Sequence, residues 1–319
     1  MKGKLAILLF LCVCIVGYSQ ETAYDKGSFK QNKIKVQIVY EHSFVQGTPA
    51  DKGKKIQENF FDKDGNKIQE VNYRFNGTVH SVHTYKYDLK GRKIEFIKYE
   101  GNKDKMIFRQ YYYYDSKGNL NMEVGFNGVE NYKTEYKFDA NNRITEVIYY
   151  LDNRVDEKRM LSYVKNTSET KVLDGTQQFL YKIAYTYNAT GQITSETKTE
   201  STGVVSKKVN YTYDAKGNLL TEEKYLNGKL ASKVIKVYDA KYRLLEVYNE
   251  TAPNSKFLVQ KYIYNASGLL TEEQYRTQPT KDFSKNTYQY LDNGVCKSVE
   301  SYYASYKEQV MYVYNYEKY

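Results

Sequence analysis

Short runs that alternate apolar and polar residues fill the chain after about residue 30. The segment Ile34–Tyr40 alternates in this way, and Leu219–Leu226 is a second run of strand length. Alternation with a period of two places one class of side chain on each face of a β-strand. No helical periodicity and no linker is evident after Ser19. The pattern therefore predicts an all-β chain.

The strand pattern repeats along the chain with a short and regular period. Each copy has an aromatic residue at the end of a strand, and successive copies are 24–27 residues apart, which gives about 11 units. Such a narrow period indicates a repeat architecture. The aligned aromatic residues are Phe61, Tyr87, Tyr114, Phe138, Tyr163, Tyr187, Tyr213, Tyr238, Tyr264, Tyr290 and Tyr314.

A turn motif follows the aromatic residue in most units. Asp or Asn comes next and Gly stands three positions later, which is typical of a type I turn with a glycine at positive φ that closes a tight hairpin. Asn142 can replace this glycine, whereas Tyr242 predicts a different turn at Asp239, and the unit at Tyr163 lacks the motif. The structural turn residues are Asp62, Gly65, Asp88, Gly91, Asp115, Gly118, Gly191, Asp214, Gly217 and Gly268.

A second reversal ends each unit, often as Asn-Gly, for example at Asn227-Gly228. Two strands per unit amount to roughly 22 strands in one antiparallel meander. Open sheets rarely exceed about 10 strands without curling, since each strand adds about 20° of twist. We therefore expect a repetitive antiparallel β-hairpin meander that coils into a spiral, solenoid-like sheet.

The first residues have the layout of a signal peptide. Lys2 and Lys4 precede the apolar run Leu5–Val16, and small residues allow cleavage after Ser19. A retained anchor or a lipid-modified Cys12 or Cys14 are the alternatives; the run is short for a membrane span, and bulky residues precede both cysteines. We predict a signal peptide at 1–19 and a single repeat domain at 20–319, with irregular N-terminal strands at 20–55.

Composition agrees with export and does not indicate a nucleic-acid binder. The net charge is +10, or +8 without Lys2 and Lys4, and the basic residues are dispersed among acidic ones. Only Cys296 remains after cleavage, so the exported chain forms no internal disulfide. The chain has 37 Tyr and no Trp, which suits half-exposed strand positions.

The tyrosine rows are the candidate binding surface. Aromatic residues two apart lie on one strand face, where exposed rings could stack on sugars; the alternative is that they pack the sheet. The candidate ligand-facing residues are Tyr112, Tyr114, Tyr136, Tyr185, Tyr187, Tyr211, Tyr213, Tyr262 and Tyr264.

Catalytic and metal-binding patterns are weak. His80 and His83 are three apart and point to opposite strand faces, and the turn Asp62–Asn66 places its glycine too early for a calcium loop. We predict no cofactor, no metal site and no enzymatic activity. A glutamate recurs after the turns, and we expect these glutamates to face lysines on the outward side of the sheet. They are Glu70, Glu95, Glu123, Glu146, Glu196, Glu222, Glu246 and Glu272.

The unit Tyr-Asp-x-x-Gly-Asn/Arg-Leu/Ile resembles the YD repeat of the RHS family. Tyr213–Leu219 and Tyr114–Leu120 are the best matches, and Tyr225–Lys229 is similar to bacterial MORN-type repeats. The RHS resemblance implies a spiral β-shell and a role as a surface protein or toxin carrier. This chain is too short for a full shell and has no C-terminal toxin domain, so only the fold style carries over.

These features lead to two hypotheses about function. The first is an exported, non-catalytic binding or scaffolding module at the cell envelope, in the periplasm, at the outer surface or secreted, with a polysaccharide or a protein as its partner. The second is a structural envelope protein that self-associates through its sheet edges. We expect no nucleic-acid partner and no transmembrane segment after cleavage, and the oligomeric state stays open.

Overall fold

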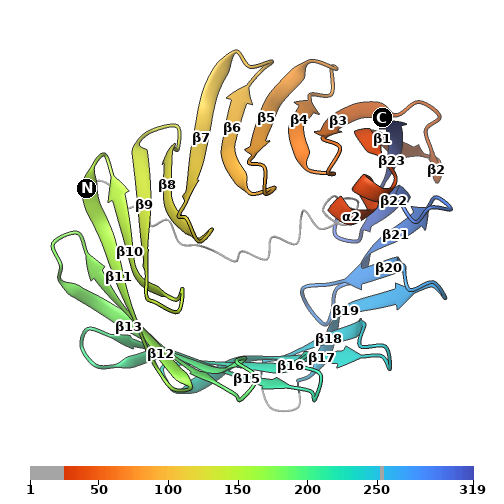
Figure 1. The fold of residues 1–319 in the computed structure, drawn as a ribbon. Coiled ribbons are helices and arrows are strands. Elements are labelled where there is room, and N and C mark those ends of the chain that lie inside the picture. The colour runs from red at the N-terminus through yellow and green to blue at the C-terminus, as the bar shows by residue number, and fades with distance from the viewer. Residues whose placement is uncertain (1–24, 252–254) are drawn as a thin grey trace.

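The computed structural model describes residues 25–251 and 255–319, and the predicted signal peptide at 1–19 lies outside them. Within this part the chain forms one short helix and 23 strands (Figure 1). The first elements are α2 (Lys26–Gln31), β1 (Ile34–Val45), β2 (Thr48–Pro49), β3 (Lys54–Phe61), β4 (Lys67–Tyr73), β5 (Val79–Tyr87), β6 (Lys93–Glu100), β7 (Lys105–Tyr114), β8 (Leu120–Phe126), β9 (Asn131–Phe138), β10 (Ile144–Leu151) and β11 (Arg154–Val164).

The second half of the chain continues in the same manner. Its strands are β12 (Thr167–Asp174), β13 (Phe179–Tyr187), β14 (Ile193–Glu200), β15 (Val205–Tyr213), β16 (Leu219–Leu226), β17 (Lys229–Tyr238), β18 (Leu244–Glu250), β19 (Phe257–Tyr264), β20 (Leu270–Tyr275), β21 (Ser284–Tyr290), β22 (Cys296–Tyr303) and β23 (Glu308–Lys318). The prediction of an all-β hairpin meander is confirmed.

The sheet closes on itself. From β3 onward each strand pairs antiparallel with the next, and β1 pairs with both β3 and β23. Since β2 pairs with β1 alone, 22 of the 23 strands form a closed barrel. The predicted spiral, solenoid-like coil is therefore wrong. The strand number was close, but closure pairs the two outermost strands, and an open coil would leave their N–H and C=O groups without partners.

The seam between β1 and β23 is long. It runs from Ile34 opposite Lys318 to Ser43 opposite Val310. Val39 lies opposite Tyr314 and packs with Tyr288, Cys296 and Val299 in the larger of two buried apolar clusters. The barrel is thus packed most densely where the two ends of the chain meet.

The predicted turn recurs at the strand ends. At Asp214 the amide of Gly217 donates to the Asp214 carbonyl at 3.0 Å, and Asp214 N donates to Asn218 O at 3.0 Å. The Asp214 carboxylate also accepts from the amides of Lys216 and Asn218. Gly217 has φ of +91°, the region that glycine reaches without steric cost.

Two turns need separate comment, because the sequence sets them apart from the other copies. Tyr242 has φ of +62° and its amide donates to Asp239 O at 2.9 Å, so the Asp239 turn has the same form as the others. The expectation of a different turn there was wrong, because the Asp239 hydrogen bonds hold a tyrosine in the left-handed region. After Tyr163, Lys165-Asn166 connects β11 to β12, with Lys165 at φ of +49°.

The helix α2 was not predicted. The Asp25 carboxylate caps it by accepting from the amides of Gly27 and Ser28, each at 3.1 Å. Phe29 is buried and its ring packs edge-on against Phe61 at 4.7 Å and Tyr316 at 5.9 Å between ring centroids. Residues 20–55 were expected to be irregular strands, and their described part, 25–55, contributes this helix, the long strand β1, the short β2 and the start of β3.

Candidate functional site on the inner wall

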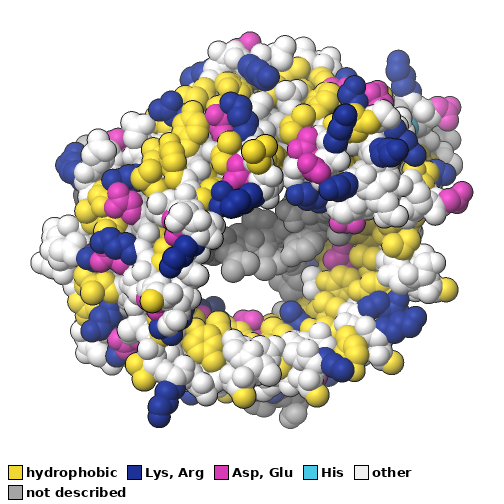
Figure 2. Space-filling model, in the orientation of Figure 1, with side chains coloured by type: hydrophobic (Ala, Val, Ile, Leu, Met, Phe, Trp, Pro, Cys, Tyr) yellow, Lys and Arg dark blue, Asp and Glu magenta, His cyan; other side chains and the backbone are white. Residues whose placement is uncertain are grey.

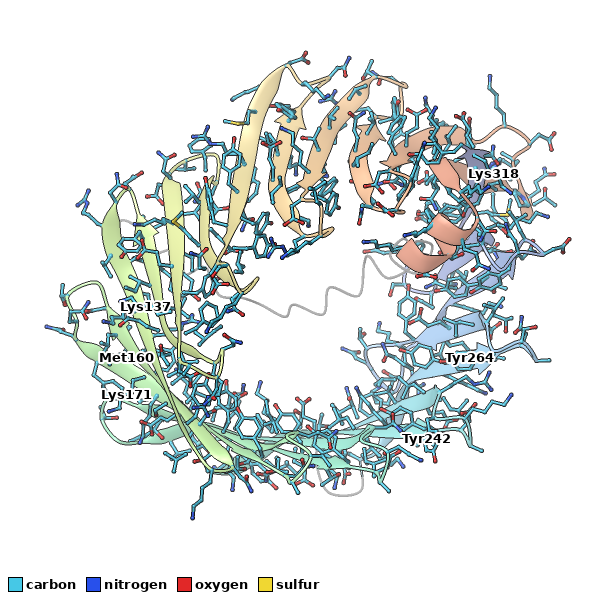
Figure 3. All side chains as sticks on the ribbon, in the orientation of Figure 1. Lys137, Met160, Lys171, Tyr242, Tyr264 and Lys318 are labelled. Carbon is cyan, nitrogen blue, oxygen red and sulfur yellow. The ribbon has the colours of Figure 1, made fainter. Side chains whose placement is uncertain are left out.

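The position of α2 identifies the inner face of the barrel. Figure 1 shows α2 inside the ring, and its Phe29 contacts Phe61 and Tyr316. Phe61 belongs to the aromatic series that ends the strands, so the residues that share its strand face line the interior. Figure 2 shows an opening in the middle of the ring in the space-filling view, and Figure 3 shows side chains on both faces of the barrel wall.

The strand-ending tyrosines hold successive hairpins together. Each hydroxyl donates to the carbonyl of the residue that begins the strand after the preceding turn, for example Tyr213 to Ile193 O at 2.7 Å. We call this contact the tyrosine clasp. The other clasps are Tyr87 to Lys67, Tyr114 to Lys93, Tyr163 to Ile144, Tyr238 to Leu219, Tyr264 to Leu244, Tyr290 to Leu270 and Tyr316 to Cys296, at 2.6–3.0 Å.

The clasps divide the candidate ligand-facing tyrosines into two groups. Tyr114, Tyr213 and Tyr264 are clasp residues, and the Tyr187 hydroxyl lies 2.8 Å from Ser168 Oγ. The hydroxyls of these four tyrosines form hydrogen bonds within the sheet. The last clasp is Tyr316, two residues beyond the aligned Tyr314, which is instead buried at the seam with 4% of its surface exposed.

The tyrosines two positions earlier form the second group. Tyr136 donates to Glu123 Oε2 at 3.2 Å and Tyr262 to Gln260 Oε1 at 3.2 Å. In the described part of the chain the hydroxyls of Tyr112, Tyr185 and Tyr211 make no hydrogen bond, and all three side chains are half-buried on the inner face. These three residues retain polar groups that a ligand could use.

An aromatic row crosses the inner wall from β5 to β9. Ring centroids are 5.1 Å apart for Tyr85 and Phe96, 5.5 Å for Phe96 and Phe108, and 6.2 Å for Phe108 and Tyr132. On β8, a Cβ at Gly125 would lie 2.4 Å from the Tyr132 ring, so glycine makes the space through which Tyr132 reaches Phe108. Sequence reasoning missed the row because only strand register brings these rings together.

Recurring glutamates lie on both faces, in contrast to the expectation that all point outward. Glu95 pairs with Lys86 at 2.8 Å and Glu146 with Lys158 at 2.7 Å on the outer face. Glu70, Glu123, Glu196 and Glu222 lie beside or opposite residues of the inner face. The register explains this difference, because successive units do not place the glutamate at the same strand parity.

Two inner glutamates have opposite electrostatic environments. Burial raises the pKa of Glu123, and the hydrogen bond from Tyr136 opposes this only in part. Burial would also raise the pKa of Glu70, but hydrogen bonds from His83 and Asn72 and the Lys67 ammonium outweigh it and lower the pKa to about 2. Burial, followed by the Glu123 charge, raises the pKa of Tyr112 to about 12.

Arg159 on β11 is one of the cations that lie among the inner tyrosines. Its guanidinium lies 4.9 Å from the Tyr149 ring centroid, and its Nε donates to Glu157 Oε1 at 2.6 Å. The cation is held by a ring face and a carboxylate at once. The inner wall of β8–β13 therefore combines aromatic surface with fixed charges.

His83 and Cys296 are of the residue types that often bind metals or take part in catalysis, but their surroundings here are those of structural residues. His83 Nδ1 lies 3.1 Å from Glu70 Oε1, and Cys296 is buried, which raises its pKa to about 12. Within residues 25–251 and 255–319 no group of three or more His, Cys, Asp or Glu residues is arranged to hold a metal ion. The described segments include no helix long and apolar enough to cross a membrane.

No family model matches the chain, and no curated protein matches it. Among solved structures, TcdB2-TccC3-Cdc42 matches with a TM-score of 0.32 and 13% identity, covering 76% of this chain and 16% of that one. Porin-like proteins from Bacteroides uniformis and Bacteroides vulgatus match with TM-scores of 0.32 and 0.22, each at 11% identity. They cover 90% and 89% of this chain and 97% and 99% of theirs.

This chain thus spans 16% of the TcdB2-TccC3-Cdc42 chain that it matches. At these TM-scores the similarities carry no argument about activity or partner. The inner wall itself has to support any proposal.

Proposed function

We propose that the protein is an exported, non-catalytic binding module at the cell envelope that holds a glycan chain against the inner wall of the barrel. The observation that carries the proposal is the set of unengaged hydroxyls of Tyr112, Tyr185 and Tyr211 on the inner face. A phenol that offers a ring and a free hydroxyl suits a sugar, which presents apolar ring faces and hydroxyl groups.

The surrounding residues support a polar, ring-bearing ligand. The carboxyl groups of Glu123 and Glu196 lie near these tyrosines and contribute to the raised pKa values of Tyr112 and Tyr185, after burial. Small-molecule sites combine apolar walls with a few placed polar groups. A protein ligand, the other partner class, would need a larger continuous contact surface than separated hydroxyls provide.

Export rests on the layout of residues 1–19, and the RHS resemblance supports a role outside the cytoplasm. We place the chain with the YD-repeat proteins of the RHS family on its Tyr-Asp-x-x-Gly units. The closed barrel offers an internal surface for binding a ligand. The signal-peptide layout and the RHS resemblance together support our proposal that the protein is located at the cell envelope.

The alternative, self-association through sheet edges, has less support. In the described residues β1 and β23 pair with each other along nine residue pairs, so the two strands that would form the edges of an open sheet are occupied. Edge-to-edge association needs unpaired N–H and C=O groups along a strand.

The test is glycan-array binding followed by calorimetry on the best ligand. We expect the triple variant Tyr112→Ala, Tyr185→Ala, Tyr211→Ala to lose at least ten-fold in affinity, because stacking and hydroxyl contacts disappear together. Thr212→Ala, an exposed residue on the opposite strand face, should bind like the natural protein. Full affinity in the triple variant, or no glycan retained on the array, would refute the proposal.

A further inference from the structure

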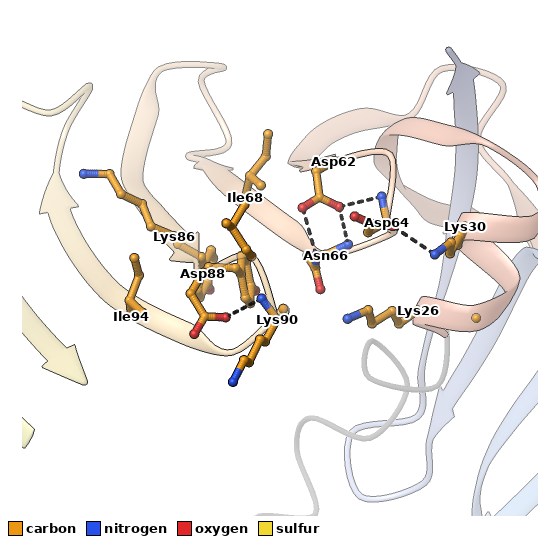
Figure 4. A pocket seen from close by; sticks show the side chains of 15 residues that line it. Lys26, Lys30, Asp62, Asp64, Asn66, Ile68, Lys86, Asp88, Lys90 and Ile94 are labelled. Atoms are coloured by element: carbon orange, nitrogen blue, oxygen red, sulfur yellow. Dashed lines mark hydrogen bonds and ion pairs between the residues drawn. The ribbon is translucent and has the colours of Figure 1, made fainter. Parts of the chain in front are cut away.

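A cavity of about 890 Å³ lies at the rim of the barrel between α2 and two neighbouring turns (Figure 4). The turns are those of the β3–β4 and β5–β6 hairpins. Lys26 and Lys90 line it together with Ile68 and Ile94 and the rings of Tyr85 and Tyr87. We call this cavity the first notch, because it separates the first two turns of the repeat.

The residue that follows the left-handed position of each turn differs in length between the copies. In some turns this residue reaches the next turn. Arg92 lies over the Tyr114 ring at 4.2 Å, Arg243 over Tyr264 at 4.6 Å, and Gln192 Nε2 donates to Gly217 O at 2.8 Å. At the first notch this residue is the shorter Asn66, whose amide donates to Asp62 Oδ2 of its own turn at 2.8 Å, as Asn218 does to Asp214. The space that a longer side chain would fill stays open.

The helix α2 supplies a cation to this space instead. Figure 4 shows Lys26 extending from α2 toward the hairpin that carries Lys90. The Lys26 amino group is 3.9 Å from the place of a Cβ on Gly91. Lys26 therefore reaches the second turn from the opposite side of the notch.

Most of the other charges around the notch have a partner nearby. Lys30 pairs with Asp64 at 2.9 Å and Lys86 with Glu95 at 2.8 Å. Asp88 accepts from Arg92 Nε at 2.7 Å, and the Asp62 carboxylate accepts from amides of its own turn.

Lys26 lies near enough to Asp64 to help lower the pKa of that carboxyl, after the hydrogen bond and charge of Lys30. Within the described segments Lys26, Lys90 and Asp62 form no ion pair, so the unpaired charges of the lining leave one net positive charge at the notch.

We propose that the first notch binds a carboxylated sugar, with Lys26 and Lys90 contacting the carboxylate. Two ammonium groups on facing elements suit one carboxylate, to which both donate charge-assisted hydrogen bonds. Ile68, Ile94 and the two tyrosine rings form the apolar part of the lining, against which the face of a sugar ring packs. This site is at the rim and does not depend on the inner-wall proposal.

The experiment is calorimetric titration of the purified protein with D-glucuronate, with D-glucose and benzoate as comparison ligands. We expect saturable glucuronate binding that is at least ten-fold tighter than binding of either comparison ligand. The double variant Lys26→Gln, Lys90→Gln should weaken it at least ten-fold. Lys117→Gln, which occupies the position of Lys90 in the next turn, should leave it unchanged.

Asn66→Gln provides a second variant that keeps both lysines. By analogy with Gln192, the longer amide should bridge to the second turn, narrow the notch and weaken glucuronate binding several-fold. The absence of saturable glucuronate binding, equal binding of glucose, tighter binding of benzoate, or full affinity in the double variant would each overturn the proposal. A glucuronate affinity that the inner-wall triple variant leaves intact would confirm that the two sites are separate.

Discussion

At the scale of single residues, the tyrosines carry two different tasks that the sequence does not distinguish. Tyr211 and Tyr213 are two apart on β15 and share the inner face, yet only Tyr213 donates its hydroxyl, to Ile193 O. The difference follows from distance along the strand, because Tyr213 lies beside the carbonyl that the preceding turn exposes. A tyrosine with a free hydroxyl therefore lies two residues from one whose hydroxyl is part of the structure.

Removing the clasp hydroxyl should destabilise the barrel. Tyr213→Phe keeps the ring and leaves the Ile193 carbonyl without its donor, so we expect the free energy of unfolding to fall by about 1 kcal/mol. Tyr211→Phe is the matched control and should change it little. Urea denaturation followed by tyrosine fluorescence measures both; equal effects of the two variants would contradict the structural assignment of Tyr213.

At the scale of elements, strand register decides which charges face inward. Glu70 on β4 pairs in register with His83 on β5 and lies on the inner face, where 14% of its side chain is exposed. Glu95 on β6 pairs with Lys86 on the outer face. The same residue type after the same turn therefore forms a partly buried polar cluster in one unit and an exposed ion pair in the next.

The Glu70 cluster predicts acid sensitivity. Its pKa is about 2 in the folded chain, below the ordinary value of 4.5, so its contribution is present above about pH 4.5 and is lost as the pH falls toward 2. The shift corresponds to a loss on the order of 3 kcal/mol. Glu70→Gln should unfold more easily at pH 7 and should flatten the loss of stability between pH 5 and pH 2.

Glu130→Gln is the control for this pH series, because Glu130 is in the β8–β9 loop, distant in sequence from Glu70 and His83. Chemical denaturation at each pH gives the free energies of unfolding. The assignment of Glu70 fails if its variant loses as much stability with acid as the natural protein does.

At the scale of the whole molecule, closure determines what surfaces the protein presents. The meander by itself has two ends, and pairing of β1 with β23 turns it into a ring with an inside and an outside. The buried cluster around Val39 and Val299, which are 1% and 0% exposed, lies at this seam. The inner wall exists as a distinct surface only because the ends meet.

A designed disulfide tests closure directly. Ser43 on β1 and Val310 on β23 are register partners, so the double variant Ser43→Cys, Val310→Cys should form an intramolecular disulfide under mild oxidation. Faster migration on non-reducing gels and reversal by a reducing agent measure it. Ser43→Cys with Thr212→Cys, on distant strands, should remain monomeric and reduced; an open chain would show no intramolecular bond in either variant.

The sequence determined the strands, their pairing with neighbours and most turns, because these depend on local alternation and on residues such as Asp214 and Gly217 within a few positions of each other. It did not determine α2, a helix too short for a periodic pattern, or the ordinary turn at Tyr242. Tertiary structure decided closure, the aromatic row from Tyr85 to Tyr132 and the open first notch. Each of these depends on which distant strands meet and in what register, and the free energy that selects that register comes from contacts between residues far apart in the chain.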